Sequence, residues 1–268
     1  MKRLFFCNYI TIVICLLLMS SCEIDNFKAP DATIQGTFYD HNGKPLEVRH
    51  GASYIQSREL SWAKDKDAYV APRRLTLQQD GTYQNTKQFA GEYLLFPIEG
   101  NFFPYWSSAS ITDADEREKS GVVVTLKSKS VITQDFKVTP YLTIEWVGEP
   151  TVITEPNGKY IECKVKFTRN QKTGFNRPDV REANFHVGRT INPQASRDGD
   201  YFPAVRTITN AQEGTELTFR TATPVKFTNV NYYLRVSMNC QTAAGDNTTN
   251  YPGMGQENYT SVKKVFVP

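Results

Sequence analysis

Short apolar segments with a two-residue period, each ended soon by a turn signal, constrain the fold of this chain most. The segments KYIECKVKFTR and NYYLRVSMNC both place an apolar side chain at every second position. This period is that of a β-strand with one buried face. Asn42-Gly43 and Asp80-Gly81 follow two earlier segments of this kind, and both dipeptides favour tight hairpin turns. The sequence therefore predicts an all-β fold built from short strands.

Pro140 marks the predicted boundary between two domains in tandem. The dipeptide Thr139-Pro140 interrupts a strand pattern, and the chain enters another with LTIEW. We therefore predict one β-sandwich over residues 31–140 and a second over residues 141–268. From Tyr141 onward the pattern resembles a fibronectin type III or immunoglobulin-like sandwich, and NYYLRVSMNC resembles its penultimate strand.

The first 21 residues have the pattern of a lipoprotein signal peptide. Lys2 and Arg3 precede an apolar run that ends in LMSSC, which resembles a bacterial lipobox. This resemblance predicts that Cys22 is acylated and that residues 22–30 form a lipidated tether. The alternative is an ordinary cleavage site with an unmodified cysteine. No later segment is apolar over the length that a transmembrane helix needs.

Two acidic residues directly after Cys22 bear on localisation. In lipoproteins of the Bacteroidota, such acids resemble a signal for export to the outer face of the outer membrane. Glu23 and Asp25 therefore predict a lipid-anchored protein that faces the cell exterior, and the inner leaflet is the alternative. The formal charge of +3 includes Lys2 and Arg3 of the signal peptide. The remaining chain is close to neutral, so we expect no nucleic acid as partner. The lipid anchor predicts the membrane as a partner.

Three blocks of sequence carry a family resemblance: ATIQGTFYDHNGKPLEV, DGTYQNTKQFAGEYLLFP and DFKVTPYLTIEW. They resemble an uncharacterised two-domain lipoprotein family of the Bacteroidota that is often encoded beside starch-utilisation-type outer-membrane transporters. The resemblance implies a carboxypeptidase regulatory-like, or transthyretin-like, sandwich over residues 31–140. It also implies a role near a glycan-uptake system, with the transporter complex as a candidate partner.

Cys163 and Cys240 fall on the inward-facing sets of their predicted strands. These strands correspond to the two bridged strands of an immunoglobulin domain, so the two cysteines are candidates for a disulfide. The alternative is a pair of small buried side chains that never meet, because fibronectin-type sandwiches usually lack the bridge.

No sequence motif indicates catalysis. His41, His50 and His186 are scattered, and the common nucleophile, zincin and phosphate-loop signatures are absent. Carboxylate pairs such as Asp113 with Asp115, or Asp198 with Asp200, lie in segments that are more typical of solvated loops. We therefore predict a protein that is not an enzyme and has no cofactor or metal site.

Aromatic residues in loops are the candidates for ligand binding. The segment GNFFPYWSS contains Phe102, Tyr105 and Trp106 around a proline, which prevents a regular central strand. Trp62 and Tyr69 lie in a charged loop. An exposed ring can stack on the apolar face of a sugar, so these five residues are candidates for glycan binding. The alternative is that the rings cap their own sandwich, and for Trp106 the sequence favours neither interpretation. Trp146 lies on an alternating strand and is predicted to belong to the core.

These observations predict a non-catalytic surface lipoprotein that binds an extracellular poly- or oligosaccharide for an uptake system. The alternative is a structural or adhesive pilus-type subunit that assembles by strand donation, or a protein-interaction scaffold. A long apolar donor segment, which strand donation requires, is missing from the short C-terminal sequence VKKVFVP.

Overall fold

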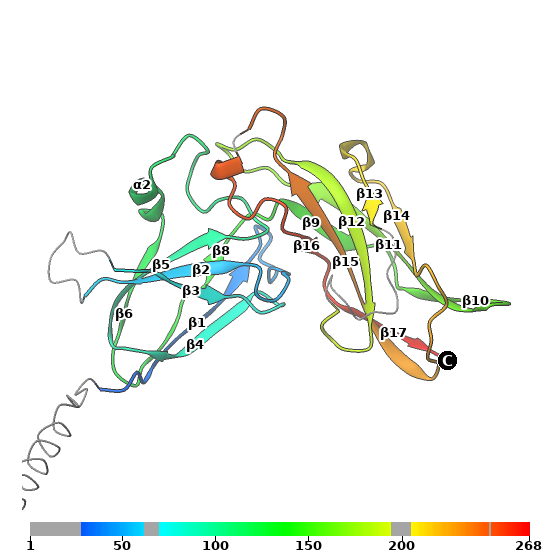
Figure 1. Cartoon of the computed structure of the whole chain (residues 1–268), viewed down its shortest axis with the longest axis horizontal. Coiled ribbons are helices and arrows are strands. Elements are labelled where there is room, and N and C mark those ends of the chain that lie inside the picture. The colour runs from blue at the N-terminus through cyan, green and yellow to red at the C-terminus, as the bar shows by residue number, and fades with distance from the viewer. Residues whose placement is uncertain (1–27, 62–69, 194–204, 247) are drawn as a thin grey trace, which may run out of the picture. The chain divides into compact units, whose positions relative to one another are not determined.

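The computed structural model describes residues 28–61, 70–193, 205–246 and 248–268 (Figure 1). Residues Asp31–Pro268 form one compact unit, whose regular secondary structure is almost entirely β-strand. Among the described residues, no helix has the length and apolar character needed to cross a membrane. The predicted all-β fold class is confirmed.

Two four-stranded sheets make up the N-terminal half (Figure 1). In the first sheet the order is β4-β1-β7, and β8 also pairs with β1. In the second sheet the order is β3-β2-β5-β6. The strands are β1 (Ala32–Tyr39), β2 (Tyr54–Glu59), β3 (Arg73–Thr76), β4 (Thr82–Gln88), β5 (Gly91–Glu99), β6 (Val122–Leu126), β7 (Val131–Thr133) and β8 (Phe136–Lys137).

One short helix, α2 (Ala114–Glu118), precedes β6. The side chain of Asp113 accepts a hydrogen bond from the backbone N–H of Glu116 at 3.0 Å and so caps the helix. Asp113 is therefore an N-cap residue, a common role for an aspartate in an exposed charged segment.

The C-terminal half also contains two sheets (Figure 1). One has the order β10-β11-β14, with β9 also paired to β11, and the other has the order β13-β12-β15-β16, with β17 also paired to β15. Its elements are β9 (Leu142–Trp146), β10 (Thr151–Glu155), β11 (Gly158–Arg169), β12 (Asp179–Gly188), β13 (Arg206–Thr207), the 3-10 helix η1 (Asn210–Gln212), β14 (Leu217–Arg220), β15 (Val230–Gln241), the 3-10 helix η2 (Thr248–Asn250), β16 (Asn258–Tyr259) and β17 (Lys263–Val267).

The apolar residues that recur at every second position of the sequence lie on the buried faces of these sheets. On β1 the alternate residues Ala32, Ile34 and Phe38 are buried, while their neighbours are partly exposed. The same alternation holds on β11, and on β15 the predicted inward set is buried throughout: Tyr232, Leu234, Val236, Met238 and Cys240. The strand predictions for these segments are confirmed because one buried face requires this spacing.

The candidate disulfide is not present. Cys163 lies on β11 and Cys240 on β15, in different sheets, and both thiols are free and buried. Burial raises the pKa of the Cys163 thiol well above its usual range and that of Cys240 to about 12. The two residues therefore act as small apolar side chains of one core, which is the alternative stated above.

The segment after β5 connects the two hydrophobic cores of the compact unit. Phe102 belongs to the core of the N-terminal sheets, whereas Phe103 and Trp106 pack into the core that the C-terminal sheets enclose. Lys172, from the loop after β11, donates hydrogen bonds to the backbone carbonyls of Pro104 and, at 2.9 Å, of Trp106. Because side chains of this segment enter both cores, the predicted domain division at residue 140 stays a prediction.

Candidate functional site

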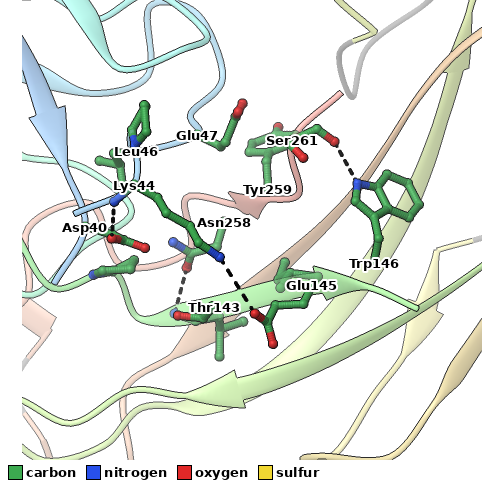
Figure 2. A pocket seen from close by; sticks show the side chains of 14 residues that line it. Asp40, Lys44, Leu46, Glu47, Thr143, Glu145, Trp146, Asn258, Tyr259 and Ser261 are labelled. Carbon is green, nitrogen blue, oxygen red and sulfur yellow. Dashed lines mark hydrogen bonds and ion pairs between the residues drawn. The ribbon is translucent and has the colours of Figure 1, made fainter. Parts of the chain in front are cut away.

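A groove with a volume of about 460 Å³ is the candidate binding site (Figure 2). Three segments line it: the turn after β1 from Asp40 to Glu47, the start of the C-terminal half from Pro140 to Trp146, and the segment from Asn258 to Ser261. This volume lies within the range of about 300–1,000 Å³ that is typical of sites for small ligands.

The turn after β1 forms one wall of the groove, and its geometry is fixed by hydrogen bonds. One carboxylate oxygen of Asp40 accepts hydrogen bonds from the backbone N–H groups of Asn42 and Lys44, each at 2.8 Å. Gly43 has a φ of 82°, a left-handed conformation that favours glycine. The turn predicted at Asn42-Gly43 is thus confirmed, and it directs Lys44 toward β9 (Figure 2).

Trp146, at the end of β9, is the aromatic residue of the groove. Its ring is half-buried and packs against the C-terminal core, and its Nε1 donates a hydrogen bond to the backbone carbonyl of Ser261 at 3.0 Å. The ammonium of Lys263 lies 5.6 Å from the ring centroid. The prediction that Trp146 is a core residue is therefore wrong in part, because the strand ends where its side chain reaches the groove.

Polar side chains also line the groove. The carboxylate of Glu145 lies 3.9 Å from the Lys44 ammonium and 4.0 Å from that of Lys166, and its side chain is 46% exposed. Thr143 is partly exposed and also lines the groove. These side chains can donate hydrogen bonds to an oxygen-rich ligand and accept hydrogen bonds from it.

Asn258 holds the base of the groove together. Its side-chain oxygen accepts a hydrogen bond from the backbone N–H of Leu142 at 3.2 Å, and its amide group donates to the backbone carbonyl of Asn101 at 2.6 Å. Asn101 in turn donates to the carbonyls of Glu47 and Glu257 at 2.9 and 3.0 Å. Buried amides with several partners give a rigid base, so the groove is preformed.

Arg235 lies behind the groove and is fully buried. Its guanidinium donates to the Glu47 carboxylate at 2.9 Å and to the carbonyls of Val48 and Thr260, both at 3.1 Å. It also lies 4.1 Å from the ring centroid of Tyr259. Burial lowers the pKa of Arg235, and the charge of Glu47 opposes that shift. The pair therefore connects the two halves of the molecule at a net cost in desolvation.

A histidine, a serine and a glutamate meet nearby without forming a catalytic site. The Ser237 hydroxyl donates to Glu257 at 2.8 Å and lies 2.7 Å from His186 Nε2. Glu257 also accepts hydrogen bonds from Asn184 at 3.1 Å and from the Tyr259 hydroxyl. Because Ser237 is 0% exposed, its hydroxyl cannot reach a substrate, and the cluster is structural.

Glu47 predicts a specific dependence of stability on pH. Burial raises the pKa of its carboxyl group from 4.5 to about 7, against the attraction of Arg235 and with a contribution from Asp80. The native state therefore binds this proton more tightly than the unfolded state does. The contribution of the protonated Glu47 to the free energy of unfolding is complete below pH 4.5 and is lost as the pH rises to about 7. Glutamine cannot lose this proton. The free energy of unfolding of Glu47→Gln, minus that of the native protein, is therefore expected to rise by about 1–3 kcal/mol from pH 4.5 to pH 7.

Urea unfolding of both proteins at intervals across this pH range measures that difference. Burial lowers the pKa of His186 to about 4, which makes stability rise with pH over part of the same range. Since His186 is present in both proteins, its effect cancels in the difference. A difference between the two proteins that stays constant from pH 4.5 to pH 7 would contradict the role given to Glu47.

Most of the predicted glycan-binding residues do not form an exposed platform. Phe102 and Trp106 are each only 1% exposed, so the prediction that they present their rings to a ligand is wrong. Tyr105 is partly exposed, and its ring packs edge-on against Phe136 with centroids 5.7 Å apart. Trp62 and Tyr69 lie outside the described residues, as do Cys22, Asp198 and Asp200.

Two features of the sequence indicate the groove in retrospect. Trp146 is the last residue of β9 and is followed closely by Gly148 and Pro150, so its strand ends before a following residue could cover the ring. The turn at Asp40 pairs a carboxylate with a nearby lysine, Lys44. Neither feature shows that these segments, about 100 residues apart in the chain, would meet.

Fold and groove together define an all-β, sandwich-type protein with a preformed polar and aromatic groove. Residues 32–139 match the N-terminal domain family DUF3823, described as a protein of unknown function. No curated protein matches the sequence.

Three solved structures are similar in fold. A DUF3823 family protein from Bacteroides uniformis has a TM-score of 0.69 and 22% identity, and the match covers 89% of this chain and 100% of that one. A DUF3823 family protein from Parabacteroides merdae has a TM-score of 0.60, 17% identity and the same coverages. A protein from Bacteroides uniformis described as a "putative carbohydrate binding protein" has a TM-score of 0.56, 20% identity and the same coverages.

Proposed function

We propose that the protein binds an oligosaccharide, or a short stretch of a polysaccharide, in this groove without transforming it. The observation that carries the proposal is the half-buried ring of Trp146 beside hydrogen-bonding side chains in a preformed groove. The structural neighbour described as a "putative carbohydrate binding protein" is consistent with this function.

The chemistry of a sugar matches the groove at two kinds of surface. The C–H groups on one face of a sugar ring form an apolar surface that can pack on the indole of Trp146. The hydroxyl groups at the ring edge can donate to Glu145, accept from the ammonium of Lys44, and both donate to and accept from Thr143. Because the Glu47 carboxylate is paired with Arg235 and Ser237 is 0% exposed, the proposed role is binding alone.

The proposal includes the location of the protein. We place the chain at the outer membrane, anchored through acylated Cys22 and facing the exterior, as an accessory to a polysaccharide-uptake system that contains a transporter. The support is the lipobox-like LMSSC and the acids that follow it. Attachment to the membrane raises the effective concentration of a binding site near a transporter, so a weak groove is sufficient. Mass spectrometry that finds Cys22 without acyl chains would contradict this anchor.

Trp146→Ala is expected to weaken glycan binding at least about thirtyfold, because truncation of a tryptophan at the centre of a binding site often costs 2 kcal/mol or more. Affinity gel electrophoresis against plant, host and fungal polysaccharides identifies the polymer that the native protein binds, and titration with that polymer measures the loss.

Two variants serve as controls for the Trp146 measurement. Trp146→Phe keeps an aromatic face and is expected to retain much of the affinity. Phe266→Ala removes a ring that is 53% exposed on β17, outside the groove, and is expected to bind like the native protein. If every polymer that retards the native protein retards Trp146→Ala equally, the groove is not the binding site.

A further inference from the structure

The charges that line the groove point to the class of glycan. Asp40, Glu47 and Glu145 contribute three acidic side chains, of which Glu47 is paired with Arg235, whereas Lys44 is the only cationic side chain among the described residues that line it. Sugar hydroxyl groups can donate charge-assisted hydrogen bonds to such carboxylates. A uronate or sulfate group would meet like charge there, which is unfavourable at close range.

The cations near the groove are already committed to other partners. All three nitrogens of Arg235 are used by Glu47 and by two backbone carbonyls. Lys263 donates to the carbonyl of Gly148 and to Glu149, both at 2.7 Å. Lys44 and Lys166 both lie beside Glu145. An acidic sugar that enters the groove would have to compete with these partners for a cation.

We propose that the groove selects uncharged glycans and discriminates against glycans that carry uronate or sulfate groups. This inference rests on the proposed function, since it names the substrate class of the same groove. Glu145 is the residue that sets the selectivity at the rim, because its side chain lines the groove and is 46% exposed.

The test compares each neutral polymer with its own carboxymethylated form, using the full chain and xyloglucan, galactomannan and soluble starch as probes. The native protein is expected to bind the neutral form at least about fivefold more tightly than the acidic form at low salt. High salt is expected to reduce the difference, because ions screen exposed charges.

Glu145→Lys is the decisive variant, and Glu216→Lys is its matched control. Each removes an exposed glutamate that pairs with a lysine of β11, Lys166 in the first case and Lys164 in the second. Only Glu145 lines the groove, so Glu145→Lys is expected to bring the acidic form to within about twofold of the neutral form. Glu216→Lys is expected to keep the native preference.

The outcomes separate this inference from the function on which it rests. Tighter binding of acidic polymers that Trp146→Ala abolishes would overturn the charge selectivity and leave the groove as a glycan site. If Trp146→Ala binds the polymers as tightly as the native protein does, or if the native protein binds no polymer of the panel, both the proposed function and the selectivity are overturned.

Discussion

Replacing Arg235 with alanine is expected to lower the free energy of unfolding by about 3–5 kcal/mol. The side chain is 0% exposed, and its removal leaves the carboxylate of Glu47 and the carbonyls of Val48 and Thr260 without their donor. Since Arg235 lies on β15 while Glu47 and Val48 follow β1, the loss also weakens the contact between the two halves of the molecule. Urea unfolding followed by tryptophan fluorescence measures the change.

Two further variants distinguish the lost pair from a general loss of charge. Arg181→Ala, on the adjacent strand β12, removes an exposed arginine whose ion pair with Glu182 spans 2.8 Å, and is expected to change stability by less than about 1 kcal/mol. The double variant Arg235→Met with Glu47→Leu removes both buried charges together and is expected to recover most of the loss. A cost for Arg235→Ala no larger than that of Arg181→Ala would refute the structural role of the pair.

Replacing Trp106 with alanine is expected to cost about 3–5 kcal/mol of unfolding free energy, the usual range for removing a large buried aromatic side chain. Its ring stacks on Phe96 with centroids 6.1 Å apart, and the guanidinium of Arg117 lies 4.5 Å from the ring. The alanine variant would leave a cavity in the C-terminal core and leave Arg117 without its aromatic partner. Thermal and urea unfolding measure the loss.

This prediction also separates core residues from ligand-binding residues. Glycan affinity of the folded Trp106→Ala protein is expected to equal that of the native protein, whereas Trp146→Ala loses it. Phe227→Ala, which removes a ring that is 41% exposed, provides the control for stability and is expected to cost about 1 kcal/mol or less. Loss of glycan affinity in Trp106→Ala at unchanged stability would restore the segment Phe102–Trp106 as the binding platform.

The candidate site was predictable only in part. The Asn42-Gly43 turn and the strand LTIEW are both local patterns, and the structure confirms both. The pairing of these segments in one groove depends on Asn101, Asn258 and Arg235, each of which makes a hydrogen bond to a residue more than 50 positions away. No local pattern contains that information, because such contacts exist only after the sheets have packed.

The sequence by itself determined the strands, since a two-residue period and glycine turns are properties of neighbouring residues. It also placed Cys163 and Cys240 on buried faces, although free thiols rather than a bridge occupy those positions. Only the tertiary structure decided which aromatic rings reach solvent. Trp106, close to a proline in an irregular segment, is buried because it packs into the C-terminal core against Phe96. Trp146, on a regular strand, is partly exposed because its strand ends at the groove. Exposure depends on what packs against a side chain from distant parts of the chain, and periodicity reports only on its neighbours.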